Sequence, residues 1–260
     1  MKTLRIAFDK SRKVFRSAFG FVIIIFVWWL ITYLGVVQPY FLPSPVKVFT
    51  AMIELISNGS LGVQLGTSLG RFIKGYLMGS TLGILVGLSM GIIPAVGKFF
   101  KPLLTFFNAV SGITWVPLAI AWMGVGNATI NFLIINAVFF MVSVTTLSGV
   151  HAVPKVYENA MLTMGASLPQ IVAQVILPGS LASIITGLRL GAGFAWRSLI
   201  AAEMAAGSSG LGFMAFKASY DYQQDVLLAS ILLVGVIALI LDGLVFAPLE
   251  RRTVMRWGLK

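Results

Sequence analysis

Residues 102–154 read PLLTFFNAVSGITWVPLAIAWMGVGNATINFLIINAVFFMVSVTTLSGVHAVP and contain no Asp, Glu, Lys or Arg. A helix that crosses the hydrocarbon core of a bilayer needs about 20 mostly apolar residues, so this stretch is too long for a single crossing. Near its middle, Gly124-Val125-Gly126-Asn127 supplies a turn. The stretch therefore predicts two membrane-spanning helices joined by a short connection.

The composition of the whole chain supports a polytopic membrane protein. Of its 260 residues, 58% are hydrophobic and 10% are charged, whereas soluble domains carry about 25% charged residues. The mean hydropathy is +0.96. The net charge of +11 comes from short basic clusters between long uncharged runs, which is unlike the basic face of a nucleic-acid-binding protein. With no Cys and one His, the chain lacks thiolate chemistry and a multi-His metal site. We expect a lipid bilayer as its surroundings, no nucleic acid and no metal.

Six segments have the length and hydropathy of membrane spans: 18–37, 72–93, 102–123, 128–149, 180–202 and 226–247. The first contains Trp28-Trp29 and has no small-residue cleavage site, so we interpret it as an uncleaved helix rather than a signal peptide. If the N-terminus lies inside, 13 of the 19 Lys and Arg residues lie in inner segments, four in outer segments and two in the fifth span. This bias predicts that both termini are cytoplasmic.

Segment 38–66 is then external. Its Leu42-Pro43-Ser44-Pro45 is expected to break the first helix, and residues 46–56 are expected to form a short helix on the membrane surface.

The second span has a regular series of glycines four residues apart: Gly75, Gly79, Gly83, Gly87 and Gly91. This spacing places them on one helix face, where another helix can approach closely. The helix that packs there belongs either to the same chain, which we favour, or to a second copy.

The loop between the fourth and fifth spans predicts a helical hairpin. Pro154 precedes its first helix, Gly165 can end that helix, and Pro178 is expected to open the next element. Such a hairpin between two spans is either a cytoplasmic docking surface or an ordinary amphipathic loop.

Ionisable groups within the spans are costly and are therefore candidate functional residues. The candidate translocation pathway comprises Arg189, Arg197, Trp196, Asn108 and Trp115. Bundle-facing arginines attract anions, but the alternative is that they pair with backbone carbonyls or carboxylates of the protein.

Three residues near the outer end of the fifth span, Glu203, Gly210 and Gly212, form either an outer gate or a structural connection. In the structural interpretation Glu203 pairs with Arg71 or Lys74. Asp242 is interpreted as an interfacial anchor.

The loop resembles the EAA loop of binding-protein-dependent ABC importer permeases, which reads Glu-Ala-Ala, three residues, Gly, then nine residues to Ile-x-Leu-Pro. Here Gly165 is followed after nine residues by Val175-Ile176-Leu177-Pro178, and the triplet is Asn159-Ala160-Met161 with Glu158 one residue early. Either Glu158 or Asn159 makes the acidic-type contact. Further segments are similar to the nitrate/sulfonate/taurine permease family: 42–45, 187–189, 201–204, 210–214, 241–242 and 249–252.

The resemblance implies an all-α integral membrane protein with the type I ABC importer permease fold in the bacterial inner membrane. A tail 1–17, a first helix and external segment 18–60, a permease core 61–250 with its coupling loop at 154–178, and a tail 251–260 would make up the chain. The partners implied are a second permease copy, two cytoplasmic ABC ATPases and an extracytoplasmic solute-binding protein. The coupling residues implied are Glu158, Asn159, Ala160, Gly165, Ala166, Leu177 and Pro178.

The implied cargo is a small anion such as a sulfonate, taurine or nitrate. ATP and Mg would belong to the partner ATPase, so this chain is expected to hold no cofactor and to be no enzyme. The nearest sequence to a P-loop, residues 91–99, has the wrong spacing and lacks the hydroxyl that holds magnesium.

Three alternative functions remain to be compared with this interpretation. A stand-alone secondary transporter or channel would leave the cytoplasmic hairpin unexplained. In the second alternative, the same permease class carries a neutral thiamine-precursor-like substrate. An intramembrane hydrolase would need Ser209 and His151 within hydrogen-bond reach, whereas the predicted topology places them on opposite sides of the bilayer.

Overall fold

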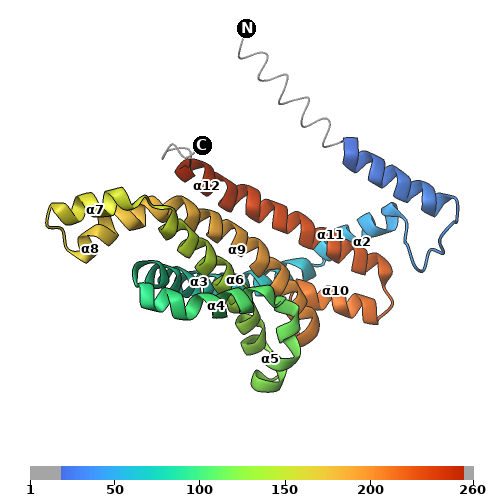
Figure 1. Ribbon diagram of the computed structural model, residues 1–260. Coiled ribbons are helices and arrows are strands. Elements are labelled where there is room, and N and C mark those ends of the chain that lie inside the picture. Colours follow the sequence, from blue (N-terminus) through green and yellow to red (C-terminus); the bar gives the residue numbers. More distant parts are fainter. Residues whose placement is uncertain (1–18, 255–260) are drawn as a thin grey trace, which may run out of the picture. The chain divides into compact units, whose positions relative to one another are not determined.

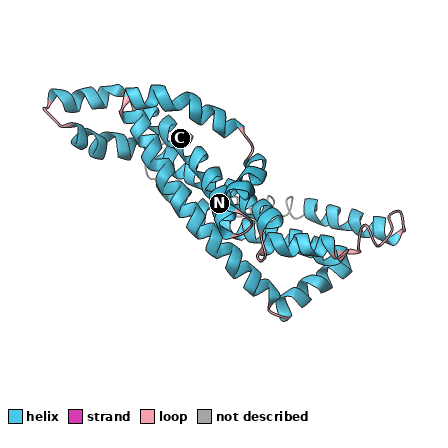
Figure 2. Cartoon of the chain, turned by 90° about the horizontal axis from the view of Figure 1, so that it is seen from below, coloured by secondary structure: helices cyan, strands magenta, loops and turns pink. Residues whose placement is uncertain are grey.

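The computed structural model describes residues 19–254, and every element in that range is a helix (Figure 2). The predicted tail 1–17 and residues 255–260 lie outside the described part of the chain. The chain forms two compact units. One contains Ala215–Leu233 and the chain before Leu61, and the other contains Leu61–Met214 and the chain from Val234 onward.

The first unit begins with an apolar helix, Phe19–Tyr33. It is shorter than the predicted span 18–37, because the chain turns at Gly35 with a φ of +66° before it reaches the prolines. Helix α2, Pro45–Ser57, matches the predicted short helix, and the Ser44 hydroxyl caps it by accepting a hydrogen bond from Lys47 N–H at 3.4 Å.

Four helices are long and apolar enough to cross a membrane. These are α3, Ser60–Ile92; α6, Asn127–Ala152; a helix over Leu168–Ala206; and a helix over Gln224–Glu250. The third comprises α8, Leu168–Ile171, a π turn over Val172–Ile176, and α9, Leu177–Ala206. The fourth combines α11, Gln224–Leu241, with a π turn over Asp242–Phe246 and α12, Ala247–Val254. The shorter α10, Leu211–Tyr220, precedes α11 (Figure 1).

The predicted third span is broken. Helix α4, Pro94–Ala109, meets a helix over Gly112–Met123, which consists of a 3-10 turn over Gly112–Trp115 and α5, Val116–Met123, at an angle of 93°. The break arises because Val110 and Ser111 adopt extended backbone conformations, with ψ of 121° and 138°. If this pair makes one crossing, the described chain has five crossings by length and composition. The sixth crossing and the cytoplasmic termini stay predictions.

The glycine series of α3 packs against α6 of the same chain. A Cβ atom built on Gly75 would lie 2.8 Å from Ile134 Cβ, and one on Gly91 would lie 2.7 Å from Val150 Cβ. The three glycines between them meet α6 in the same way. The missing side chains therefore allow a close helix pair within one chain.

Helix α6 also packs closely against α9. A Cβ atom on Gly149 would lie 2.6 Å from Ser183 Cβ, and a Cβ atom on Gly191 would lie 3.1 Å from Val142. The core of the second unit is built around α6, and its fully buried members include Ile130, Ile134 and Val138. This packing makes α6 the helix against which α3 and α9 are both positioned.

Candidate functional site

The predicted helical hairpin is present at the ends of α6 and α9 (Figure 1). Helix α7, Lys155–Thr163, ends at Gly165, which has a φ of +78°. The Gly165 N–H donates to Leu162 O and the Ala166 N–H donates to Met161 O, both at 3.0 Å. These two bonds are the pair that closes a Schellman motif. Gly165 therefore supplies the left-handed residue that lets the chain reverse into α8.

One side of the hairpin is buried and the other is exposed. Met161 and Ala166 pack against a small cluster formed by Val150, Ile171 and Ile176. Apolar side chains on the outer side are exposed, and these are Val156, Tyr157, Leu162 and Met164. Among the predicted coupling residues, Glu158 is half-buried, whereas Asn159 and Ala160 are exposed. The hairpin thus offers an unpartnered surface of mixed apolar and polar character.

Pro178 was expected to open a new element, and it lies in the first turn of α9, Leu177–Ala206. The helical path is nevertheless continuous from Leu168 to Ala206. A π turn over Val172–Ile176 lies directly before the proline. Proline has no N–H to donate to the preceding turn, and π turns change the hydrogen-bond pattern of a helix locally. The hairpin is consequently continuous with the membrane-spanning part of α9.

A cavity of about 530 Å³ lies where the broken α4–α5 pair meets α6 and α9. Its lining comprises Phe107, Asn108, Val110, Ser111, Gly112, Ile113, Asn136, Ala137, Phe140, Met141, Phe194, Arg197 and Ser198. Two of the five predicted pathway residues, Asn108 and Arg197, come together here. Asn136, Ser111 and Ser198 were not predicted, because single uncharged polar residues in apolar runs carry no periodic signal.

Arg197 is the charged residue of this lining. Its guanidinium carbon lies 5.9 Å above the centre of the Phe194 ring, a cation–π contact that leaves the hydrogen-bond donors of the guanidinium available. Broken backbone at membrane depth is tolerated where it lines a cavity. The arrangement can therefore attract an anion into this cavity.

Arg189 occupies different surroundings. Its Nε and Nη2 donate to the two oxygens of Asp242, each at 2.8 Å, and its Nη1 donates to Glu250. This is the pairing with protein carboxylates that the sequence left open as the alternative. Asp242 thus contacts an arginine of the neighbouring helix, which the interpretation as an interfacial anchor did not foresee.

Of the two predicted tryptophans, Trp196 lies in the core and Trp115 is half-buried against it. Trp196 is 6% exposed and its ring contacts that of Phe72 edge-on at 5.7 Å. It also lines a cavity of about 290 Å³ together with Arg189 and Arg197. The ring of Trp115 lies 5.7 Å from that of Phe107, so it supports a residue of the large cavity without lining it.

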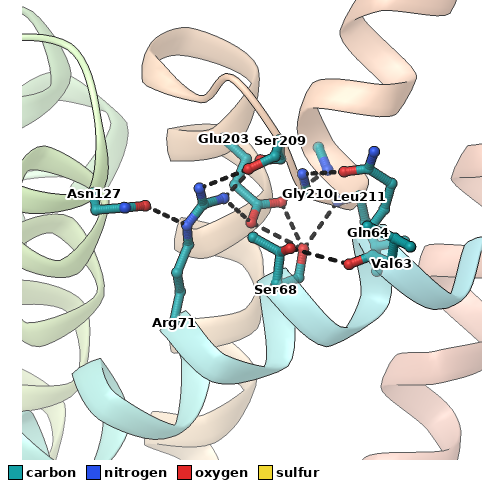
Figure 3. A network of polar contacts seen from close by, with 11 residues as sticks. Val63, Gln64, Ser68, Arg71, Asn127, Glu203, Ser209, Gly210 and Leu211 are labelled. Carbon is teal, nitrogen blue, oxygen red and sulfur yellow. Dashed lines mark hydrogen bonds and ion pairs between the residues drawn. The ribbon is translucent and has the colours of Figure 1, made fainter. Parts of the chain in front are cut away.

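A buried network of polar contacts surrounds Arg71 and Glu203 (Figure 3). Arg71 Nη1 lies 2.8 Å from Glu203 Oε1, and Glu203 is fully buried. Arg71 Nε also donates to Asn127 Oδ1 at 2.8 Å, while its Nη1 and Nη2 donate to the backbone oxygen and hydroxyl of Ser209. Of the two partners that the sequence offered for Glu203, the structure places Arg71 at hydrogen-bond distance.

The turn between α9 and α10 is fixed by the same network. Gly212 N–H donates to Glu203 Oε2 at 3.0 Å, and Ser68 Oγ lies 2.9 Å from both carboxylate oxygens. Gly210 has a φ of +110°, and a Cβ atom there would overlap the Glu203 carboxylate. The turn therefore requires glycine both for its backbone conformation and for space.

The hydrolase alternative does not fit this geometry. Ser209 is held by Arg71, whose other partner, Asn127, is the first residue of α6. His151 lies in the last turn of α6, 24 residues further on, which is about 36 Å along a helix axis. Within residues 19–254 no three metal-ligating His, Cys, Asp or Glu side chains come together either.

The comparisons with known proteins agree on one class. Residues 79–253 match the family described as binding-protein-dependent transport system inner membrane component. The chain is 34% identical to the taurine transport system permease protein TauC of Escherichia coli, over 93% of this chain and 90% of that protein. It is 33% identical to a putative aliphatic sulfonates transport permease protein of Bacillus subtilis, over 90% and 84% of the two chains.

A more distant relative and a solved structure extend this likeness. The nitrate import permease protein NrtB of Synechocystis is 26% identical, over 91% of this chain and 88% of that protein. Among solved structures, a chain of the inward-facing MetNI methionine ABC transporter aligns with a TM-score of 0.59 and 20% identity, covering 78% of this chain and 97% of that chain. This last likeness shows the fold.

Proposed function

The chain belongs to the family of binding-protein-dependent transport system inner membrane components and is a permease subunit of an ABC importer, and we propose that it forms the pathway for a small anion. The candidate cargoes are a sulfonate, taurine or nitrate, the substrates in the names of its relatives. A solute-binding protein delivers the cargo from outside, and ATP hydrolysis with Mg in a separate ATPase drives the transport.

The observation that carries this proposal is the hairpin of α7 and α8. It exposes apolar and polar side chains together, and its second helix is continuous with α9. We propose that one ATPase docks on this hairpin and that Glu158, Asn159 and Ala160 contact it. A movement of the ATPase is then transmitted along α9 to Arg197 in the cavity wall.

The cavity supports the anion pathway. Arg197 provides a guanidinium fork that matches the oxygens of sulfonate, carboxylate or nitrate, and Asn108 and Asn136 add amide groups to the same lining. A neutral substrate would leave Arg197 without an ionic function in this cavity. The anion is therefore favoured over the thiamine-precursor-like alternative.

The organisation of the complex belongs to the same proposal. Two copies of this chain assemble with two ATPases in the bacterial inner membrane, with both termini and the hairpin at residues 154–178 in the cytoplasm. The core 61–250 carries the transport function, the segment 18–60 precedes it, and 1–17 and 251–260 are tails. Within the core, the turn at Glu203, Gly210 and Gly212 is structural.

The decisive experiment replaces Gly165 with valine. A β-branched residue is strained at a φ of +78°, at a cost of about 1–3 kcal/mol, so the hairpin should be misdirected while the apolar helices still insert. We expect Gly165→Val to reach the membrane but to lose the ATPase or its substrate-dependent ATP hydrolysis. Co-purification with the ATPase and ATP-driven uptake into proteoliposomes measure both effects.

Two matched variants control for strain and for bulk. Gly165→Asn adds a side chain that tolerates the left-handed region, and it should retain docking. Gly59→Val imposes comparable strain at a φ of +73° between α2 and α3, and it should leave docking intact. If Gly165→Val docks and transports normally, the hairpin is only a connector and the proposal is wrong. Single Glu158→Ala and Asn159→Ala variants then identify the acidic-type contact by the larger loss of docking.

A further inference from the structure

The turn between α10 and α11 has a tyrosine at a position where helices commonly end with glycine. Among the residues that the structure describes, Tyr222 is the one residue other than glycine with a positive φ, at +59°. Its N–H donates to Ser219 O at 3.3 Å, and the Gln223 N–H donates to Ala218 O at 2.8 Å. These two bonds form a Schellman motif, in which glycine usually takes the left-handed position. A bulky side chain at this position strains the backbone.

The packing of Tyr222 within the protein does not account for this strain. Its side chain is 70% exposed, and its ring lies 6.2 Å from that of Tyr40. The Tyr40 ring meets the exposed ring of Phe41 edge-on at 5.3 Å. We call these three exposed rings, Tyr40, Phe41 and Tyr222, the aromatic patch. Strain that is retained at an exposed side chain indicates that the side chain acts on something outside the chain.

The aromatic patch lies directly before a candidate membrane span. Tyr222 is two residues from the start of the helix Gln224–Glu250, which has the highest hydropathy of the four long apolar helices. The same helix is the least buried of the four within the chain. A residue just outside such a span lies near the boundary between the hydrocarbon core and the lipid headgroups.

The other two rings follow a second exposed apolar helix. Most of the large apolar side chains of Phe19–Tyr33 are exposed, and the exposed apolar surface continues past its end through Val36 to the aromatic patch. Trp28 Nε1 donates to Pro43 O at 3.1 Å, which holds the segment that carries the patch to this helix. The patch is therefore the end of a continuous apolar surface, and it adds two tyrosine hydroxyls to that surface.

We propose that the aromatic patch binds the lipid bilayer at the level of the headgroups. Its rings contact the acyl chains, and the hydroxyls of Tyr40 and Tyr222 lie among the headgroups. Tyrosine suits this layer because its ring is apolar and its tip is polar, and it is enriched at membrane interfaces. Insertion of the Tyr222 ring offsets the strain of its turn. Glycine would form the same turn without strain, but it would leave the start of α11 without this anchor.

The test measures the depth of spin labels in the membrane. The sequence contains no cysteine, so Phe41→Cys places one label in the patch of the assembled permease–ATPase complex in lipid vesicles. Oxygen concentrates in hydrocarbon and a nickel chelate stays in water, so collisions of the label with each report its depth. Labels at Phe26→Cys, in the apolar helix, and at Glu54→Cys, an exposed carboxylate of α2, are the two references.

An interfacial position gives an intermediate result. We expect the Phe41 label to collide with the chelate less often than the Glu54 label does, and with oxygen less often than the Phe26 label does. A Phe41 label as open to the chelate as the Glu54 label overturns the inference, and so does one as deep as the Phe26 label.

Variants of Tyr222 test whether its ring is the anchor, with a label at Val36→Cys as the reporter. Tyr222→Trp keeps an interfacial side chain and should leave the collisions of this label unchanged. Tyr222→Gly removes both the ring and the strain. It should increase the collisions of the label with the chelate, while thermal stability in detergent stays equal or rises. Unchanged collisions in Tyr222→Gly would show that Tyr222 is no anchor.

A protein partner at the aromatic patch would give a different result. The Phe41 label is measured again after the solute-binding protein is added. If lipid covers the patch, the collisions of the label are the same with and without this protein. If the label is open to the chelate alone and becomes protected when the solute-binding protein is added, the patch is a protein-docking surface and the inference is wrong.

Discussion

Arg71 and Arg197 show two uses of the same side chain in one unit of the protein. Arg71 is 8% exposed, and its donors bind Asn127, Glu203 and Ser209. Arg197 is exposed and lies over the ring of Phe194. The difference shows that the supply of protein acceptors decides whether a guanidinium in an apolar bundle ties helices together or can meet a ligand.

The backbone around each arginine explains why Arg71 has more protein hydrogen-bond acceptors nearby than Arg197. The turn between α9 and α10 has oxygens and N–H groups that no helix satisfies, and Arg71 with Glu203 and Ser68 binds them. Arg197 lies in the regular part of α9, where the backbone groups are already paired. Its neighbours across the cavity are the side chains of the broken helix.

The largest expected effect comes from removing the partner of Arg71. Glu203→Ala leaves a buried guanidinium without its carboxylate, and breaking a buried pair in this way costs about 3–5 kcal/mol. We expect a large fall in the thermal stability of the purified protein, measured by unfolding in detergent. Glu54→Ala, which removes an exposed carboxylate of α2, is the control. Equal stability of the two variants would show that the buried network does not hold these helices together.

A smaller loss is expected when the close packing of α3 against α6 is disturbed. Gly87→Ala would place a Cβ atom 2.7 Å from Ser143 O and Thr146 Cβ on α6, so the helices must separate, at about 1–3 kcal/mol. Gly70→Ala, on the same helix with nothing within 4 Å, should be neutral or slightly stabilising. The same unfolding measurement compares them, and equal stabilities would show that α3 and α6 are not closely packed.

The smallest expected effect on stability belongs to Arg197. Arg197→Gln breaks no ion pair among the described residues, so stability should change by less than about 0.5 kcal/mol, while uptake falls and basal ATP hydrolysis persists. Arg197→Lys should restore uptake partly, because an ammonium cannot form a bidentate fork. Lys217→Gln, at an exposed position on α10, should transport normally. Unchanged uptake in both Arg197 variants would show that Arg197 does not bind the cargo, and its proposed difference in function from Arg71 would be wrong.

The sequence predicted the features that depend on local or periodic signals. The glycine spacing indicated a close helix contact, and Gly165 between two short helical segments indicated the hairpin. The break between α4 and α5 was missed because residues 102–123 are apolar on both sides of it. Hydropathy shows that a segment is apolar but not that its helix axis bends. Pro178 does stand in the first turn of α9, but the sequence did not reveal the π turn that joins this helix to α8 without a break.

The candidate site was only partly predictable for a different reason. Arg189 pairs with residues 53 and 61 positions away, and no local pattern specifies such partners. Arg197 was identified because a charged residue stands out in an apolar span, and Asn108 was named beside it as a further pathway candidate. Asn136 joins them only through the packing of α6 against the broken helix.

The glycine series of α3 also has a consequence for how α3 and α6 are positioned along their axes. Gly75 meets Ile134, Gly83 meets Val142 and Gly91 meets Val150, so each contact joins residues 59 positions apart. Because the series repeats every four residues, a slide of one helical turn, about 5.4 Å, would bring most glycines opposite an equivalent position. A repeating surface holds two helices close without defining their register. At the end of this pair the hydrogen bond from Arg71 joins α3 to Asn127, whereas Asn131, one turn further along α6, carries the same amide without this contact.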